Sequence, residues 1–232
     1  MTLKGIVFDL DQTLYDRNAT DLLAMAAYYA SHRESFAEDC SLQKAQSAML
    51  IADHDNGHFG WNRILDSLKA QGLFKTAPSA DDICSCFQEQ YALHGVLYPS
   101  TLPMFEGLKE LGLKTGLITN GKTDGQMGKV KGMGLERCFD RICIGCDKAT
   151  AKPHPDLFLE MAGNLGCKPE ELLYVGDHPV NDIQASRLAG YTPIWIRTMP
   201  WDYPEVEKPE LQIDDLSELL VIAGNFLSHG RT

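Results

Sequence analysis

The segment from Gly5 to Phe8 ends directly at a carboxylate, and this feature restricts the possible folds more than any other part of the chain. The segment is apolar and rich in β-branched and aromatic residues, and Asp9 follows it. Such a pattern predicts a strand that is buried on both faces and ends at the carboxyl edge of a parallel sheet, where open α/β proteins bind their ligands. Asp11 lies two residues further on, so two carboxylates of one extended segment point the same way and need a cation or a shared proton.

Two later apolar segments end in polar side chains as well. One leads into Thr119 and Asn120, followed by Gly121, which frees the backbone for a tight turn, and the other leads into Asp177. From residue 99 onward such segments alternate with helix-like ones, and this order predicts an α/β fold with a doubly wound, Rossmann-like parallel sheet. If the three strands are neighbours, their polar ends meet in one crevice.

Residues 16–98 have a different character. Apolar side chains recur there at helical spacing, as in Leu22, Met25 and Tyr29, and no segment has a convincing strand pattern. We therefore expect four or so helices that form a second domain, inserted after the first strand. The predicted domains are a core of residues 1–15 and 99–232 and a helical insertion of residues 16–98.

The composition excludes several classes of protein. The chain has 232 residues with 44% hydrophobic and 23% charged side chains, as in soluble globular proteins. Its net charge of −11 argues against nucleic-acid partners, and neither a signal peptide nor a membrane span of about 20 apolar residues is recognisable. The seven cysteines lack the paired spacing of a zinc site and indicate reduced thiols. We expect a cytoplasmic protein without nucleic-acid or membrane partners, either a monomer or a homodimer.

The side chains expected in the crevice are oxygen ligands accompanied by one ammonium group. Carboxylates without imidazole or thiolate partners suit a hard cation such as Mg²⁺. A cation beside a lysine and a hydroxyl group suits a phosphoryl group, whose transfer depends on positioning and charge stabilisation. One of the carboxylates could act as a nucleophile or as an acid and base. The set comprises Asp9, Asp11, Asp177, Asp182, Thr119, Asn120 and Lys152.

Four segments resemble the four motifs of the haloacid dehalogenase superfamily, in the family's order and across nearly the whole chain. Any one of them alone would be a weak signal, but the combination is specific. The insertion of residues 16–98, between the first two motifs, looks like the helical cap of the first cap subclass. The four segments are Asp9-Leu10-Asp11-Gln12-Thr13-Leu14, Leu117-Ile118-Thr119-Asn120-Gly121, Lys152-Pro153-His154-Pro155-Asp156 and Gly176-Asp177-His178-Pro179-Val180-Asn181-Asp182.

The resemblance implies a role for each residue of the first motif. Asp9 would attack phosphorus and form an aspartyl-phosphate. Asp11 would protonate the leaving oxygen and then activate water, while its backbone carbonyl binds Mg²⁺. Thr13 would brace the turn. Gln12 departs from the family, which more often has Gly or Asn at this position of a loop thought to flex with the cap.

The other three motifs imply the rest of the site. Thr119 and the backbone amides of Asn120 and Gly121 would hold the phosphoryl oxygens, and Lys152 would offset the charge between Asp9 and the phosphate. Asp177 would bind Mg²⁺ directly, and Asp182 would support it through water or through Lys152. His154 and His178 flank these motifs, and we treat them as loop residues.

The sequence thus leads to a Mg²⁺-dependent phosphatase of the superfamily's phosphatase branch. Its substrate would be a small phosphorylated metabolite, such as a sugar phosphate, phosphoglycolate or a nucleoside monophosphate. A phosphomutase is the main alternative, because an aspartyl-phosphate can return its phosphoryl group to a sugar. A 2-haloacid dehalogenase fits less well, since that branch lacks an acid at the position of Asp11. A non-catalytic protein that binds a phosphorylated metabolite is a third alternative.

Substrate choice is expected to depend on the insertion, where residues 54–63 are rich in aromatic, imidazole and glycine residues. Two interpretations stay open for this segment. Either it is a loop between helices whose Phe59 and Trp61 simply pack, or it lines the substrate's leaving group, with His58 or Arg63 recognising a polar substituent.

Overall fold

The chain divides into two compact units in the computed structural model, which describes residues 2–56, 60–146, 149–199 and 207–229. The first unit contains Met1–Asp16, Leu97–Met127 and Gly134–Thr232, and the second contains Arg17–Val96 and Gly128–Met133. The domain boundaries at residues 16 and 98 stay a prediction from the sequence, which assigned residues 128–133 to the core. That the second unit acts as a cap stays a prediction as well.

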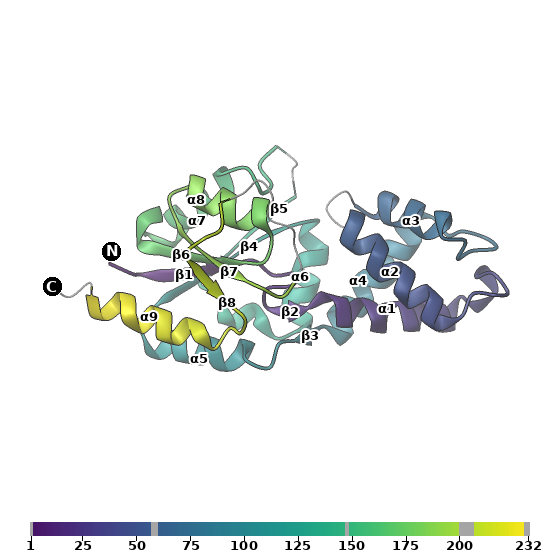
Figure 1. Cartoon of the computed structure of the whole chain (residues 1–232), viewed down its shortest axis with the longest axis horizontal. Helices are drawn as coiled ribbons and strands as arrows, with labels where there is room; N and C mark the ends of the chain where they lie inside the picture. Colours follow the sequence, from purple (N-terminus) through teal and green to yellow (C-terminus); the bar gives the residue numbers. More distant parts are fainter. Residues whose placement is uncertain (1, 57–59, 147–148, 200–206, 230–232) are drawn as a thin grey trace. The chain divides into compact units, whose positions relative to one another are not determined.

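A parallel sheet forms the centre of the first unit, as the α/β interpretation predicts. Within the described residues it has six strands in the order β5-β4-β1-β6-β7-β8, and every neighbouring pair is parallel (Figure 1). β1 lies between β4 and β6, with Phe8 beside both Leu117 and Val175, so the carboxyl ends of these three strands are adjacent. The strands are β1 (Gly5–Phe8), β4 (Lys114–Asn120), β5 (Arg141–Gly145), β6 (Leu172–Gly176), β7 (Thr192–Ile196) and β8 (Leu211–Ile213).

Helices cover both faces of this sheet, with α7 and α8 on one side and α5 and α9 on the other (Figure 1). In α7 the apolar side chains repeat at helical spacing. Two of them, Phe158 and Met161, belong to a buried cluster with side chains of the strands, namely Val7, Ile118 and Tyr174. The helix ends at Gly166, which adopts the left-handed conformation that glycine tolerates best. The helices of this unit are α5 (Thr101–Glu110), α6 (Thr123–Gly132, whose last turn belongs to the helical unit), α7 (Asp156–Leu165), α8 (Ala185–Leu188) and α9 (Glu218–His229).

The second unit contains the expected four helices. Its core is aromatic and aliphatic, and includes Tyr28, Phe36, Met49 and Phe87. Ser79 caps the last helix, because its hydroxyl oxygen accepts a hydrogen bond from the backbone N–H of Asp82 at 3.1 Å. The helices are α1 (Arg17–Ser31), α2 (Leu42–Asn56), α3 (Trp61–Ala70) and α4 (Ala80–His94). Among the described residues, no helix combines the length and the apolar character that crossing a bilayer requires.

Short elements depart from the sequence-based expectation. Residues 16–98 were expected to lack strands, but β2 (Tyr15–Asp16) and β3 (Val96–Leu97) enter a two-stranded sheet, and β8 was not foreseen. Strands of two or three residues are too short to produce a periodic pattern. A π-helical turn, Pro179–Gln184, follows the end of β6. Such turns are frequent at functional sites.

Candidate active site

The ends of β1, β4 and β6 bring the predicted residues together at one edge of the sheet. Asp9 continues β1, and its backbone N–H donates to the carbonyl oxygen of Val175 in β6 at 2.9 Å. Asp177 follows β6 directly. Gly176 allows Asp182 to approach, because a Cβ atom at this position would lie 2.5 Å from the Asp182 side chain.

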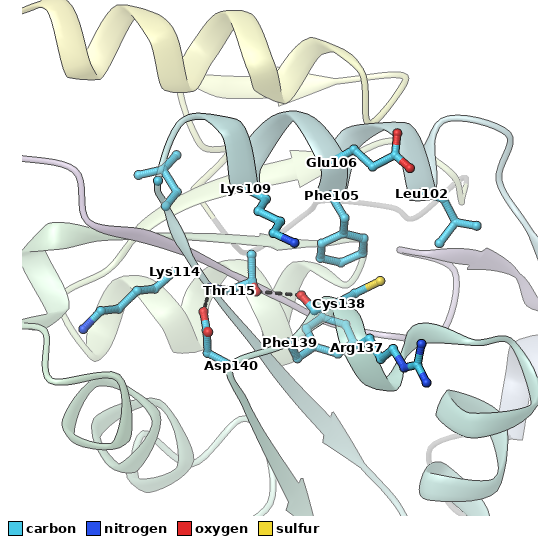
Figure 2. A pocket seen from close by; sticks show the side chains of 12 residues that line it. Leu102, Phe105, Glu106, Lys109, Lys114, Thr115, Arg137, Cys138, Phe139 and Asp140 are labelled. Carbon is cyan, nitrogen blue, oxygen red and sulfur yellow. Dashed lines mark hydrogen bonds between the residues drawn. The ribbon is translucent and has the colours of Figure 1, made fainter.

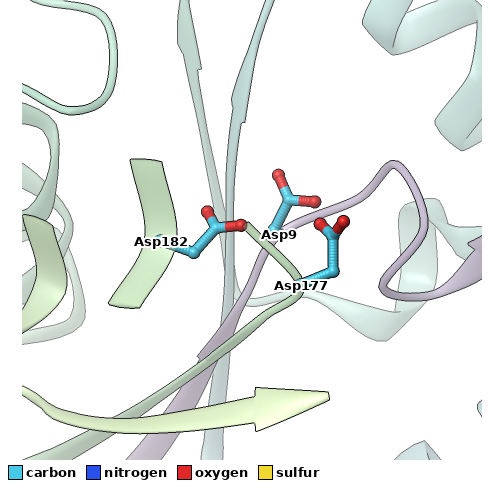
Figure 3. A group of neighbouring side chains, drawn as sticks. All are labelled: Asp9, Asp177 and Asp182. Atoms are coloured by element: carbon cyan, nitrogen blue, oxygen red, sulfur yellow. The ribbon is translucent and has the colours of Figure 1, made fainter. Parts of the chain in front are cut away.

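Three of the predicted carboxylates form a buried cluster (Figure 3). Asp9, Asp177 and Asp182 each offer an oxygen atom, and these atoms all lie within 4.8 Å of one another. Each residue is at most 6% exposed. Burying carboxylates this close together is costly unless positive charge balances them. The Asp11 carboxylate is not part of this group, so only its backbone carbonyl remains as the expected metal contact.

Lys152 supplies part of the balancing charge. Its Nζ donates to Asp9 Oδ1 at 2.6 Å, to Asp182 Oδ1 at 2.7 Å and to the Tyr174 hydroxyl at 3.1 Å. Burial by itself lowers the pKa of Lys152, but the carboxylates of Asp182 and Asp9 outweigh burial and raise it above its ordinary value. The lysine therefore stays protonated.

Asp9 needs more positive charge than Lys152 provides. The pKa of Asp9 is raised to about 7, chiefly by burial; the Lys152 ammonium opposes this shift, and the carboxylates of Asp182 and Asp11 add to it. When ionised, the three clustered carboxylates and Lys152 leave two negative charges, which a divalent cation would neutralise. The donor set consists of oxygen atoms and fits Mg²⁺. The two oxygens of Asp182 accept three hydrogen bonds, from Lys152 Nζ, the Tyr174 hydroxyl and the His178 backbone N–H. The two oxygens of Asp9 accept two, from Lys152 Nζ and the Thr13 hydroxyl, so Asp182 is the more heavily engaged of these two carboxylates.

The loop that carries Lys152 is held by the Asn120 side chain. Asn120 Oδ1 accepts from the Lys152 backbone N–H at 2.9 Å, and Asn120 Nδ2 donates to the Lys152 carbonyl at 2.8 Å. The Gly121 backbone N–H donates to the Gly145 carbonyl oxygen at 3.0 Å. The sequence assigned phosphate binding to the backbone amides of Asn120 and Gly121, and that role stays a prediction. The side-chain role of Asn120 was not foreseen.

Asp11 and Thr119 share a partner, the Gln126 side chain of α6. Gln126 Nε2 donates to Asp11 Oδ2 at 3.0 Å and to Thr119 Oγ1 at 2.5 Å. The Tyr15 hydroxyl donates to the other oxygen, Asp11 Oδ1. Thr13 Oγ1 donates to Asp9 Oδ2 at 3.1 Å, so the threonine that was expected to brace the turn also contacts the expected nucleophile.

The family model of haloacid dehalogenase-like hydrolases matches residues 3–190 of the chain. The chain belongs to the haloacid dehalogenase-like hydrolase family. The sequence-based recognition of this family is thereby confirmed.

Relatives of this haloacid dehalogenase-like hydrolase carry phosphatase names. A glyceraldehyde 3-phosphate phosphatase of Methanocaldococcus jannaschii is 30% identical over 229 residues, covering 96% of this chain and 98% of the relative. One of Methanopyrus kandleri is 35% identical over 127 residues, but this match spans only 53% of this chain and 54% of the relative. The magnesium-bound HAD-hydrolase YfnB of Bacillus subtilis has the same fold, with a TM-score of 0.77 at 21% identity, covering 96% of this chain and 99% of that one.

Several residues of the hydrolase site were missed from the sequence. Gln126 lies in a helix without any distinguishing pattern. Trp195 in β7 donates its indole N–H to the carbonyl oxygen of Asp177 at 3.0 Å and so fixes the backbone of a predicted ligand. Tyr174 of β6 donates its hydroxyl hydrogen to Asp182 Oδ1 at 3.0 Å, and the sequence analysis gave it no role. Only Tyr174 had a usable signal, because a hydroxyl within a strand that leads to the site can reach its neighbours.

The structure describes only two of the four residues proposed to select the substrate, and their role in selection stays a prediction. His58 and Phe59 lie outside the described residues. Trp61 begins α3, and its ring packs on Phe87 with 5.0 Å between centroids, which supports the packing interpretation for this residue. Arg63 is exposed on α3. His178 has a structural role, because its Nδ1 accepts the backbone N–H groups of Val180 and Asn181.

A cavity of about 570 Å³ lies at the opposite edge of the sheet, between α5, the start of β4 and residues 137–140 (Figure 2). Lys114 and Thr115, which open β4, contribute to its wall, whereas Thr119 and Asn120 close the same strand. None of the predicted catalytic residues lines this cavity. In open α/β sheets the carboxyl edge carries the chemistry, so we place the hydrolase site at the acidic cluster.

Proposed function

We propose that this hydrolase is a Mg²⁺-dependent phosphatase that cleaves a small phosphomonoester through an aspartyl-phosphate on Asp9. The observation that carries the proposal is the environment of Asp9. Its carboxylate is bound by Lys152 and Thr13 and lies in a buried cluster that keeps two excess negative charges. This arrangement supports a nucleophile prepared for a dianionic substrate and a divalent cation.

The first step transfers the phosphoryl group to the protein. A carboxylate oxygen of Asp9 attacks phosphorus, and the bond between phosphorus and the leaving oxygen breaks. Asp11 gives its proton to that oxygen, which departs as an alcohol. Lys152 and the Thr119 hydroxyl would stabilise the negative charge on the phosphoryl oxygens.

The second step returns Asp9 to its original state. The Asp11 carboxylate takes a proton from water, and the water oxygen attacks phosphorus. The bond between Asp9 and phosphorus then breaks, which releases inorganic phosphate. Asp9, Asp177 and the Asp11 carbonyl would hold Mg²⁺, with Asp182 in support, and the bound ion would supply positive charge that keeps Asp9 ionised.

The relatives and the net charge of the chain support the substrate class. The two relatives described above are named for glyceraldehyde 3-phosphate, a small phosphorylated metabolite. A net charge of −11 makes binding of a polyanion unfavourable, so we propose a small phosphomonoester. A panel of such metabolites identifies the substrate, and an unchanged substrate ranking in Arg63→Ala would refute the proposal that Arg63 selects it.

Hydrolysis of 4-nitrophenyl phosphate by the purified full chain tests the chemistry. We expect turnover that requires Mg²⁺ and that falls at least a thousandfold in Asp9→Asn, because the nucleophile is lost while the shape of the side chain is kept. Asp156→Asn, at an exposed carboxylate of the third motif, serves as the control and keeps its activity. Turnover without metal, or an active Asp9→Asn variant, would contradict the mechanism.

A further inference from the structure

The buried carboxamide of Gln126 contacts two groups that the proposed reaction uses. The residue is 5% exposed and lies in the first half of α6, within the same unit as the acidic cluster. Its nitrogen lies 3.0 Å from Asp11 Oδ2 and 2.5 Å from Thr119 Oγ1. Burying an amide is unfavourable unless its hydrogen bonds are made, so both contacts contribute to its orientation.

The chemistry of the two partners fixes the direction of these hydrogen bonds. An ionised carboxylate only accepts, so the amide nitrogen of Gln126, which carries two hydrogens, faces Asp11. Its other hydrogen goes to the Thr119 oxygen. Because that hydroxyl accepts from Gln126, its own hydrogen can be donated to a different acceptor.

The backbone around Gly121 leaves room for this side chain. Gly121 has a φ of +139°, and a Cβ atom at this position would lie 3.1 Å from Gln126 Cγ. A side chain there would force the Gln126 side chain to shift, because this distance is shorter than an ordinary van der Waals contact. Glycine at position 121 therefore permits the backbone turn and also leaves space for the Gln126 side chain.

We propose that Gln126 is a positioning residue for the phosphoryl transfer, an inference that rests on the proposed function. Gln126 holds the Asp11 carboxyl group in the position from which it donates its proton to the leaving oxygen. That proton is transferred as the bond between phosphorus and the leaving oxygen breaks. Gln126 also turns the Thr119 hydroxyl hydrogen toward the phosphoryl oxygens. A carboxyl oxygen has two lone pairs, so the oxygen that accepts from Gln126 can also carry the proton.

The test compares two aryl phosphates whose leaving groups differ in their need for a proton. Nitrophenolate leaves readily as an anion, whereas phenolate is much more basic and depends on Asp11. For Gln126→Met, which keeps the length of the side chain without its donors, we expect kcat/KM on phenyl phosphate to fall about tenfold more than on 4-nitrophenyl phosphate. Inhibition by inorganic phosphate should weaken several-fold, because Thr119 loses its orientation.

Two controls separate positioning from a general structural role. Gln184→Met makes the same substitution at an exposed glutamine of the same unit and should leave both esters unaffected. In the Asp11→Asn background, Gln126→Met should no longer change the ratio between the esters, because the group it acts through is gone. If Gln126→Met does not fold, Gln126→Asn, which keeps the amide on a shorter side chain, replaces it.

The outcomes are distinct from those of the proposed function. If Gln126→Met lowers kcat/KM equally on the two esters, or on neither, the role of Gln126 is overturned. Wild-type turnover and its loss in Asp9→Asn would then still support the proposed function. Absence of turnover in the wild type, or turnover that survives Asp9→Asn, would instead overturn the proposed function itself.

Discussion

Single side chains at the acidic edge hold one another in place. Lys152 contacts Asp9, Asp182 and Tyr174 with one ammonium group, and Asn120 holds the backbone on both sides of that lysine. Removing one partner from such a network leaves a buried charge without compensation, which costs more than the net contribution of the pair. The polar groups of this edge are therefore expected to behave as a unit in mutational tests.

Gln12 has a backbone conformation that suits glycine or asparagine better. Its φ is +59°, and this left-handed conformation costs an ordinary residue about 1–2 kcal/mol. Its side chain accepts a hydrogen bond from the Tyr98 hydroxyl at 3.0 Å, which offsets part of that cost. In a Tyr98→Phe background, where this hydrogen bond is absent, we expect Gln12→Gly to raise the free energy of unfolding by roughly 1 kcal/mol, measured by urea denaturation.

Gln90→Gly is the matched control for this prediction. Gln90 lies within α4, where the backbone is right-handed and glycine destabilises a helix by roughly 1 kcal/mol. The two substitutions should therefore shift stability in opposite directions. Equal destabilisation at both positions would show that Gln12 is not strained.

The sequence predicted which polar residues stand at strand ends, because a polar group after an apolar strand is a local pattern. Asp9, Thr119 and Asp177 are of this kind. Gln126 could not be found in this way, since its role depends on α6 bringing it back to β1 and β4. The family's preference for glycine or asparagine at the position of Gln12 was a weak indication of a left-handed backbone. The sequence of this chain alone does not reveal the φ angle of Gln12.

A polar cluster links three helices of the second unit. Asp21 of α1 accepts from the Tyr91 hydroxyl of α4, and Arg17 of α1 donates to Asp53 of α2. The Lys129 ammonium lies 4.8 Å from the centre of the Tyr91 ring. Burial and the charge of Asp53 raise the pKa of Asp21 to about 8, although Arg17 opposes this shift. The Asp21 carboxyl group therefore keeps its proton up to a higher pH than an exposed aspartate does.

This shift predicts that the stability of the protein depends on pH through Asp21. A carboxyl group whose pKa is raised by folding stabilises the folded state at low pH, and this contribution is lost as the pH rises from about 4 to about 8. The loss is at most about 1.4 kcal/mol per pH unit. We expect Asp21→Asn to remove this dependence, so that the variant gains stability relative to the wild type as the pH increases.

Urea denaturation at pH 5.5 and 8.5 measures the effect. Asp39→Asn, at an exposed carboxylate of the same unit, provides the comparison and should follow the wild type. Parallel pH profiles for Asp21→Asn and the wild type would contradict the prediction.

Long elements were predictable from the sequence and short ones were not. The four helices of the second unit follow from their apolar periodicity, and the strands β1, β4 and β6 follow from short continuous apolar segments that end in polar residues. β2, β3 and β8 have two or three residues each and exist because a neighbouring strand pairs with them. The π-helical turn at Pro179–Gln184 depends on the His178 side chain, which caps two backbone amides that a sequence pattern does not reveal.

For the molecule as a whole, metal binding should act as a source of stability. Loading the acidic cluster removes its two excess negative charges, and a ligand that binds only the folded state stabilises it by about 2.7 kcal/mol at a concentration of 100 times Kd. We expect millimolar Mg²⁺ to raise Tm by several degrees and EDTA to reverse the change, measured by differential scanning calorimetry. The increase should vanish in Asp177→Asn and persist in Asp156→Asn. An Asp177→Asn variant that responds like the wild type would place the cation elsewhere.

The indole of Trp195 gives this chain a built-in optical probe. Its N–H donates a hydrogen bond to the carbonyl of Asp177, the residue is 7% exposed, and the Lys208 ammonium lies 5.7 Å from the centre of the ring. Because ultraviolet emission from tryptophan responds to nearby charge, arrival of an ion beside Asp177 alters the light emitted by Trp195. Occupancy can then be titrated on unlabelled protein, before any substrate is known.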